Sequence, residues 1–184
     1  MRLTEPRIPT LDEAKWDDEQ KELIGRAGER EQTFNIFRTL VRHPKALKRW
    51  MVFANHVLFK STLGAREREI VILRIGWLCR AEYEWAQHVV IGKRAGLTDA
   101  EIDMISAGPD APGWDRFDAA LVRATDELHA DAIISDETWA TLAERYNEQQ
   151  MIDLVFAIGN YSLVSMMLNT LGVQLDPGLE GFKS

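Results

Sequence analysis

Residues 66–96 read R-E-R-E-I-V-I-L-R-I-G-W-L-C-R-A-E-Y-E-W-A-Q-H-V-V-I-G-K-R-A-G, and this stretch decides the fold. Its first part, about 65–80, is apolar on nearly every side, which is the pattern of a buried helix. The β-branched residues there also permit a strand, but the length of the segment and its flanking Arg/Glu pattern favour a helix. A second helix is expected over about 82–95, with Gly96 at its C-terminal end. We therefore expect a central buried helix with a second helix packed closely against it.

Helical spacing of apolar residues continues on both sides of this stretch. Residues that commonly cap helices mark three of the expected starts: Thr98, Ser135 and Asn147. The further expected helices cover 12–27, a short segment within 34–41, then 44–58, 99–105, 114–130, 135–143 and 147–171. No stretch alternates as a half-buried strand does, so the fold is predicted to be all-α, with helices packed around the buried central one.

The length of 184 residues predicts a single domain over 1–184. Prolines near the start predict an extended N-terminal arm over 1–11, which must lie on its own domain or on a neighbouring subunit. Residues 173–184 form a predicted C-terminal tail. The Gly- and Pro-rich loop at 108–113 is interpreted as a connection between two helical halves, because each half alone is small.

Composition argues against several classes of function. The chain is 46% apolar and 28% charged, which is an ordinary globular mixture. A net charge of −7 argues against nucleic acid or an anionic membrane as a partner. The start of the chain lacks the apolar region of a signal peptide, and the longest apolar run, 70–79, is too short to span a bilayer. The single cysteine cannot form an internal disulfide, so we expect a soluble, cytoplasmic protein.

Three residues of the central stretch suggest acid/base chemistry. Glu84 and His88 are four residues apart and are therefore neighbours on one face of the second helix. A carboxylate beside an imidazole raises the pKa of the imidazole and fixes its tautomer. Glu69 would lie on the otherwise apolar surface of the first helix. A buried carboxylate needs a partner there, and His88 on the second helix is a suitable partner. Gly76, seven residues further on, would let the two helices approach closely.

Each of these residues also has a purely structural interpretation. His88 can be a satisfied core histidine, Glu84 can form a surface pair with it, and Glu69 can pair with a neighbouring arginine. The aromatic residues beside Glu84 are more often core residues, and a cysteine on an apolar helix is usually inert. No metal site is predicted, because no second His or Cys lies at ligand spacing from His88, and no cofactor is predicted.

Glu69, the apolar run, C-R-A-E-Y-E-W-A-Q-H and G-K-R-A-G-L-T-D-A-E-I together resemble the core motif of the carboxymuconolactone decarboxylase family, which includes the alkylhydroperoxidase AhpD branch. The resemblance is specific over about 63–105. The later segments A-T-D-E-L-H, S-D-E-T-W and I-G-N-Y-S-L-V-S-M-M-L-N-T-L-G-V resemble a longer subgroup of the family. The resemblance implies an all-α, AhpD-like fold and a homo-oligomer, a trimer or hexamer, with the site near a subunit interface.

The sequence departs from the peroxidase branch of that family, which has a C-x-x-C pair. The corresponding positions are Ala81 and Glu84, and Cys79 lies two residues before the first of them. The peroxidase mechanism needs one thiolate to attack the peroxide and a second thiol to resolve the product. A single cysteine cannot supply both thiols at the usual places.

The decarboxylase branch keeps a histidine and acidic groups without the cysteine pair. Loss of CO2 from a carboxylated unsaturated lactone needs a dienolate-like charge to be stabilised and a carbon to be protonated. By resemblance, His88 is the predicted acid/base and Glu69 its orienting or relay partner. The predicted catalytic residues are His88, Glu69 and Glu84, and the predicted substrate-binding residues are Tyr83, Trp85, Arg74, Arg80 and Cys79.

Three functions remain open at this point. The first is a cofactor-free acid/base enzyme acting on a small carboxylated or lactone-like substrate. The second is a peroxidase that uses Cys79 with an external thiol. The third is a non-catalytic helical oligomer, in which the apolar helix 65–80 and Met166-Met167 form the interface.

Overall fold

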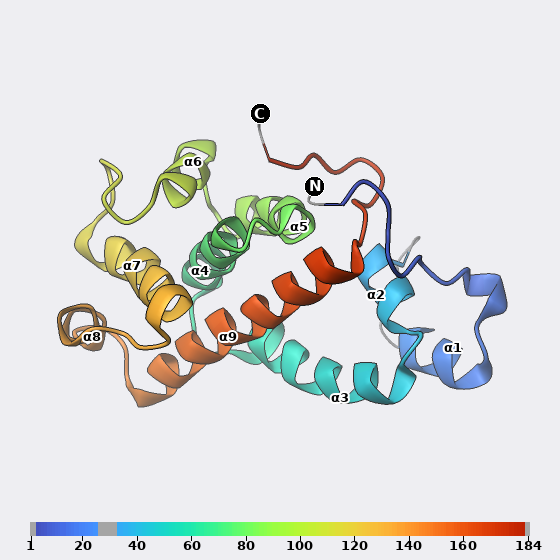
Figure 1. The fold of residues 1–184 in the computed structure, drawn as a ribbon. Helices are drawn as coiled ribbons and strands as arrows, with labels where there is room; N and C mark the ends of the chain where they lie inside the picture. Colours follow the sequence, from blue (N-terminus) through green and yellow to red (C-terminus); the bar gives the residue numbers. More distant parts are fainter. Residues whose placement is uncertain (1–2, 26–32, 183–184) are drawn as a thin grey trace.

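The computed structural model describes residues 3–25 and 33–182, and all regular structure within them is helical (Figure 1). In chain order the elements are η1 (Glu13–Lys15), α1 (Asp18–Gly25), α2 (Asn35–Leu40), α3 (Pro44–Asn55), η2 (His56–Lys60), α4 (Ala65–Leu78), α5 (Glu82–Arg94), α6 (Asp99–Ala107), α7 (Arg116–Asp131), α8 (Asp136–Ala143) and α9 (Glu148–Leu171). The element η1 is a 3-10 helix and η2 is a π-helix. The predicted all-α class is confirmed.

The helix α4 lies at the centre of the fold, with α5, α7 and α9 packed against it and α6 at its side (Figure 1). Every residue from 69 to 76 is buried, as expected for a helix that is apolar all round. Residues 69–76 are covered by their own chain, so in the alternative of a non-catalytic oligomer they do not form the interface.

The starts of the later helices follow from their capping residues. The side chain of Thr98 accepts a hydrogen bond from the third residue of α6, and Asn147 does the same at α9. Ser135 caps α8 in the same way, so all three predicted starts are confirmed. The helix α9 ends at Gly172, which has the left-handed conformation that glycine adopts at no steric cost.

The expected helix over 12–27 differs from the observed structure. Asp12 caps η1, and Trp16 is then extended, so the chain leaves helical geometry for two residues before α1. Asp17 and Gln20 exchange hydrogen bonds between side chain and backbone, which starts α1 afresh. Two competing cap residues therefore divide the segment, and the predicted end of this helix at Gly28 lies outside the described residues.

Both ends of the described chain lie on the domain itself. The backbone N–H groups of Arg7 and Ile8 donate to the carbonyl of Leu171 at the end of α9. The backbone N–H of Leu11 donates to the carbonyl of Arg38. The predicted N-terminal arm is therefore extended along its own chain, next to the C-terminal tail (Figure 1).

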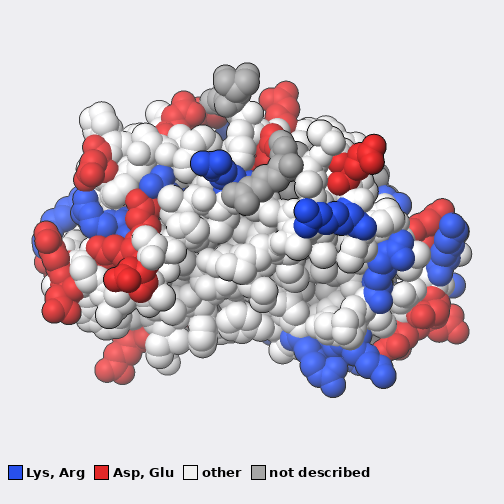
Figure 2. Space-filling model, in the orientation of Figure 1, with Lys and Arg blue, Asp and Glu red and all other residues white. Residues whose placement is uncertain are grey.

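Among the described helices, only α9 is long and apolar enough to cross a membrane. Of its most apolar 18-residue segment, 56% is buried inside the protein. A core helix of this length passes the same test. Figure 2 shows that the surface along the course of α9 carries few charged side chains in this view.

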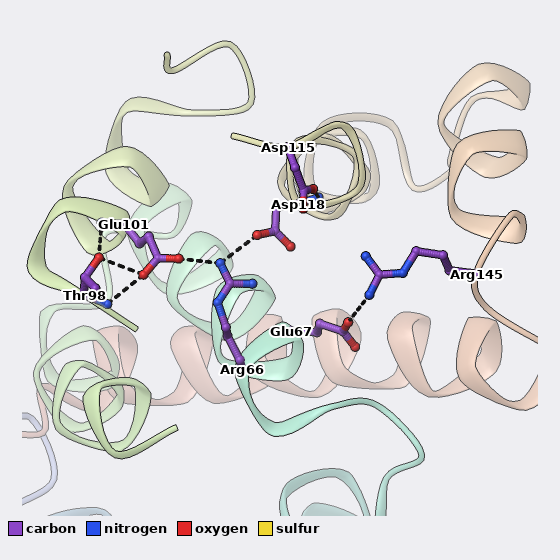
Figure 3. A network of polar contacts seen from close by, with 7 residues as sticks. All are labelled: Arg66, Glu67, Thr98, Glu101, Asp115, Asp118 and Arg145. Carbon is purple, nitrogen blue, oxygen red and sulfur yellow. Dashed lines mark hydrogen bonds and ion pairs between the residues drawn. The ribbon is translucent and has the colours of Figure 1, made fainter. Parts of the chain in front are cut away.

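A network of charges fixes the N-terminal end of α4 (Figure 3). The Arg66 guanidinium donates to Glu101 on α6 at 2.5 Å and to Asp118 on α7 at 2.7 Å. Burial alone would raise the pKa of Glu101, but hydrogen bonds from Arg66 and Thr98 lower it to about 2. One guanidinium therefore ties α4 to two neighbouring helices.

Candidate functional site

The helices α4, α5 and α9 meet around a buried carboxylate and imidazole. The side chains of Glu69 and His88 are 0% and 8% exposed, and Nδ1 of His88 lies 2.7 Å from Oε2 of Glu69. Arg68 donates from Nε to the other oxygen of Glu69 at 3.3 Å. The ring of Tyr161 meets the imidazole edge-on, with 4.8 Å between ring centroids. We call Glu69, His88 and Tyr161 the His88 layer.

A second set of residues repeats this arrangement further along the same three helices. Glu84 on α5 is 2% exposed, and the hydroxyl of Ser165 on α9 donates to its Oε2 at 2.9 Å. A Cβ placed on Gly76 of α4 would lie 3.1 Å from the other oxygen of Glu84. Gly76, Glu84 and Ser165 form the Glu84 layer. The expected close approach of α4 and α5 at Gly76 is confirmed, and Glu84 bonds to Ser165 rather than to His88.

The spacing of the residues on each helix explains the two layers. Glu69 and Gly76 are seven residues apart on α4, while His88 and Glu84, like Tyr161 and Ser165, are four apart. Seven and four residues correspond to about two turns and about one turn of an α-helix, so each helix presents both of its residues on one face.

The two buried carboxyls lie in different electrostatic surroundings. Burial raises the pKa of Glu84 well above its ordinary value, and the single hydrogen bond from Ser165 opposes this only in part. Within the described residues, Oε1 of Glu84 has no hydrogen-bond partner. Burial and the charges of Glu69 and Glu84 raise the pKa of Tyr161 well above its ordinary value. Burial therefore favours the protonated, neutral form of both Glu84 and the phenol of Tyr161.

The geometry of the His88 layer also determines the tautomer of the neutral imidazole. A carboxylate only accepts hydrogen bonds, so the proton of neutral His88 lies on Nδ1 and points at Glu69. The lone pair of Nε2 is then available to accept a proton. This is the arrangement of a general base held in place by a carboxylate.

The structure does not bring the predicted cation Arg74 to this site. Its guanidinium binds Asp126 of α7 with two hydrogen bonds, at 2.5 and 2.8 Å. It also donates to the carbonyls of Ile105 and Ser106 at the end of α6. Arg74 thus fastens α4 to α6 and α7, on another side of the helix from Glu69.

The predicted substrate-binding aromatic residues of α5 face the C-terminal tail. The hydroxyl of Tyr83 donates to Asp176 and accepts from the backbone N–H of Ile36. Burial and the charge of Asp176 raise the pKa of Tyr83. Trp85 packs against the rings of Trp77 and Phe182. Both residues serve to dock the tail in this structure.

The remaining predicted residues lie at the far end of α4. Cys79 is partly exposed, and its Sγ lies 3.9 Å from Nδ1 of His129 on α7. Arg80 is exposed and has a positive φ of 51°. Ten residues of helix rise by about 15 Å, which separates Cys79 from Glu69 along α4. The predicted residues therefore fall into separate groups rather than one site.

A small pocket lies away from His88. It is lined by Leu3, Glu82, Tyr83, Leu168, Asn169, Gly172 and Val173. The described residues include no cluster of three or more His, Cys, Asp or Glu side chains that could hold a metal ion.

Tyr161 and Ser165 are the site residues that sequence reasoning missed. They are polar, four residues apart and buried on α9, whose other buried residues are mostly apolar. Polar residues at helical spacing on the buried face of α9 were a usable signal, because such groups need partners inside the fold.

Comparisons with known proteins concern the family and the fold. Residues 44–127 match the model of the family described as "Carboxymuconolactone decarboxylase family". No curated protein matches the chain at a significant level.

Several solved structures have a similar fold. An uncharacterized peroxidase-related protein from Ralstonia eutropha, described as an alkylhydroperoxidase AhpD core, has a TM-score of 0.81 at 16% identity, over 94% of this chain and 93% of that one. An uncharacterized peroxidase-related protein from a Silicibacter species has a TM-score of 0.77 at 14% identity, over 95% and 96% of the two chains. A cysteine-to-alanine variant of the debrominase Bmp8, in complex with 2,3,4-tribromopyrrole, has a TM-score of 0.76 at 11% identity, over 95% and 94%.

At these identities the solved structures show the fold alone, while the family model identifies the segment that carries Glu69, Glu84 and His88. Residues 44–127 therefore match the carboxymuconolactone decarboxylase family, and the chain as a whole has an AhpD-like fold.

Proposed function

We propose that this protein is a cofactor-free acid/base enzyme in which His88 transfers a proton to or from a small carboxylated or lactone-like substrate. The observation that carries the proposal is the 2.7 Å hydrogen bond between His88 and the fully buried Glu69. A buried carboxylate orients the ring and stabilises its protonated form, which is what a group that both takes and gives a proton requires.

The reaction class supported by the family is decarboxylation of an unsaturated lactone. The bond between the substrate carbon and its carboxylate breaks, CO2 leaves, and the electron pair delocalises into the lactone carbonyl as a dienolate. Protonated His88 then gives its Nε2 proton to carbon and recovers a proton from water. Glu69 keeps its hydrogen bond to Nδ1 of His88 and orients the ring throughout.

The raised pKa of Glu84, which favours its neutral form, suits an anionic substrate. A second carboxylate one turn from His88 would repel such a substrate, whereas a neutral carboxyl does not. Burial favours the neutral form of Glu84, and Arg68 partly compensates the charge of Glu69. The site therefore keeps one carboxylate for orienting His88 without concentrating negative charge.

The test is a turnover assay with carboxylated unsaturated lactones, following CO2 release and loss of lactone absorbance. We expect His88→Gln and Glu69→Gln each to lower kcat by about 100-fold or more, the range that general acid/base groups supply. The matched control is His129→Gln, which removes a histidine on α7 and leaves this activity unchanged. Equal turnover by folded His88→Gln and wild type contradicts the proposal.

A second candidate function is a thiol peroxidase at Cys79. The observation that favours it is the partly exposed Sγ at 3.9 Å from the His129 imidazole, which can accept the thiol proton. The thiolate would attack a hydroperoxide, giving a sulfenic acid and an alcohol. An external thiol would then form a mixed disulfide with release of water, and a second thiol would regenerate Cys79.

The same variants separate the two functions. Peroxide reduction with an external thiol as reductant should be lost in Cys79→Ser and His129→Gln and kept in His88→Gln. Peroxide reduction that persists in Cys79→Ser and His129→Gln, and is lost in His88→Gln, excludes the thiol mechanism.

A further inference from the structure

Positive charge is concentrated in one segment of this acidic chain. Residues 33–66 contain seven Lys or Arg and no Asp or Glu, so this segment carries +7 and, with a net charge of −7 for the whole chain, the rest carries −14. Five of the seven side chains are exposed: Arg42, Lys45, Lys48, Arg49 and Lys60. Within the described residues none of the five pairs with a carboxylate, and the bonds of Arg42 and Arg49 go to backbone carbonyls. The segment therefore presents cations that the protein itself does not neutralise.

Exposed apolar side chains stand among these cations. Lys48 and Arg49 precede Val52 by four and three residues, so all three lie on one side of α3, and Lys45 lies one turn earlier on that side. Val52 is 73% exposed. In η2, Phe59 is 67% exposed and is followed directly by Lys60. The outer side of α3 and η2 is therefore both basic and apolar.

The apolar part of this surface continues onto α9. The ring of Phe53 on α3 meets that of Phe156 on α9 edge-on, with 5.2 Å between centroids. After Glu148 the only charged residue of α9 is Asp153, which is buried and bonded to His56. One side of α9 exposes only apolar residues among its large side chains: Ile152, Val155, Phe156, Leu163 and Met166.

We call this apolar side of α9, together with the exposed side of α3 and η2 from Lys45 to Lys60, the docking face. Figure 2 shows a broad uncharged surface with a group of Lys and Arg side chains at its edge, where the start of α3 lies in Figure 1. Cations thus border the apolar surface on the side of α3.

We propose that the docking face binds the surface of an anionic lipid bilayer, with α3 and α9 lying along it. The apolar side chains would enter the boundary between headgroups and acyl chains, as they do in helices that lie on membranes. The lysines and arginines would keep their charged ends among the anionic headgroups while their aliphatic stems cover apolar surface. The opposite side of α9 belongs to the protein core, so this helix lies on the bilayer and does not cross it.

Other occupants satisfy only one half of this surface. A nucleic acid would pair with the cations of α3 but leave the apolar side of α9 in water, because α9 contains no Lys or Arg. A purely apolar partner would cover α9 but would remove unpaired cations from water, which costs free energy. A bilayer with anionic headgroups offers an apolar interior and a charged surface side by side.

The acidic residues of the chain limit the strength of this binding without blocking it. The nearby helix α1 packs against α3 and carries exposed Asp18, Glu19 and Glu22. It lies at the end of the molecule beyond the start of α3 and away from α9 (Figure 1). At physiological salt, charges more than about 8 Å away are largely screened, so the local cations decide the sign of the interaction. The inference does not rest on the catalytic proposal.

The test is cosedimentation of the full chain with sucrose-loaded vesicles of phosphatidylcholine, either alone or mixed with phosphatidylglycerol. We expect at least about tenfold tighter binding to the mixed vesicles, and a large loss of that binding at high salt, because headgroup attraction is electrostatic. Equal binding to both kinds of vesicle overturns the proposal.

Paired substitutions separate the charge from the apolar contact. Lys48→Gln with Arg49→Gln should weaken binding to the mixed vesicles about 20-fold or more, since each cation near an anionic surface contributes about fivefold. The matched control is Lys93→Gln with Arg94→Gln at the end of α5, which removes the same charge outside the docking face and should bind as the wild type does.

Val52→Gln with Phe59→Gln should weaken binding by at least about tenfold, because the two side chains no longer enter the bilayer. Ile133→Gln is its control, since Ile133 is 63% exposed outside the docking face. Circular dichroism confirms that all variants keep their helical content. Unchanged binding by either folded face variant, or equal loss in its control, contradicts the proposal.

A wild type that binds no phosphatidylglycerol vesicles also overturns the proposal and assigns the docking face to a protein. Sedimentation equilibrium of the same variants then identifies that protein. A mass that falls in Val52→Gln with Phe59→Gln means a second copy of this chain, and an unchanged mass leaves an acidic partner.

Discussion

Glu69 and Glu84 are two buried carboxyls whose burial is compensated in different ways. Glu69 has an imidazole and a guanidinium as partners, so it can be buried with its charge. Glu84 has one neutral hydroxyl as its partner, and burial raises its pKa. The identity of the partner side chain, rather than the depth of burial, separates an orienting carboxylate from a neutral acid.

The raised pKa of Glu84 predicts how stability depends on pH. Because the folded state holds the proton more tightly than the unfolded chain, the contribution of Glu84 is fully present below its ordinary pKa of 4.5 and is lost as pH rises towards the higher folded value. Glu84→Gln keeps the shape without the charge. We expect its free energy of unfolding to exceed that of the wild type at pH 8 and the difference to shrink towards pH 4, measured by urea denaturation. A constant difference at all pH values contradicts this assignment.

Gly76 is predicted to be intolerant of a side chain. The added Cβ would lie 3.1 Å from Oε1 of Glu84, whose carboxyl is held by Ser165 and cannot move aside freely. We expect Gly76→Ala to lower the free energy of unfolding by about 1–3 kcal/mol, despite the better helix propensity of alanine.

A double-mutant cycle checks the cause. In a Glu84→Ala background the cost of Gly76→Ala should disappear, because the opposing oxygen is gone. If Gly76→Ala destabilises the Glu84→Ala variant as much as it does the wild type, the strain does not come from contact with Glu84.

At the scale of helices, apolar periodicity and capping residues were sufficient to predict most elements. The buried helix expected over about 65–80 is α4, and the long helix opened by Asn147 is α9. The pairing of Glu69 with His88 was also predictable, because both lie in adjacent helices of one short stretch. Ser165 was not, since it meets Glu84 across 81 positions and depends on how α9 docks.

The rotation of residues around a helix explains where the substrate-binding predictions differ from the structure. Arg74 follows Glu69 by five residues, and Tyr83 precedes His88 by five. Five residues correspond to about 140° around the axis, so each side chain points away from the His88 layer. The spacing therefore indicates that Arg74 and Tyr83 point away from His88. Their partners Asp126 and Asp176 depend on how α7 and the tail pack, which the spacing does not give.

The contact between α4 and α6 predicts an acid-sensitive element. The pKa of Glu101 is lowered to about 2, so its contribution to stability is present above the ordinary value of 4.5 and is lost as pH falls towards 2. We expect Glu101→Gln to cost about 1–2 kcal/mol at pH 7, allowing for partial solvent screening, and almost nothing near pH 2. Urea denaturation across this range checks it, with Glu180→Gln at an exposed tail position as control. A cost that persists at pH 2 would show that the carboxylate charge is not responsible.

At the scale of the whole molecule, Tyr83 links three separate parts of the chain. Its hydroxyl joins α5 to Asp176 of the tail and to the start of α2, and Asp176 also accepts the backbone N–H of Asn35. We expect Tyr83→Phe to lower the free energy of unfolding by about 1 kcal/mol, because Asp176 keeps its other donors. Limited proteolysis should then cut the C-terminal tail faster than in the wild type, while cleavage in the loop 108–113 stays unchanged. Equal cleavage of the tail in both proteins would show that the hydroxyl does not hold it.

The central position of α4 has a consequence for synthesis of the protein on the ribosome. This helix leaves the ribosome before α7 and α9, which cover two of its sides, so its apolar surface stays uncovered until nearly the whole chain has been made. Both layers of the site include a residue of α9, the last helix. A nascent chain that stops before residue 148 therefore has an exposed, aggregation-prone core helix and an incomplete site.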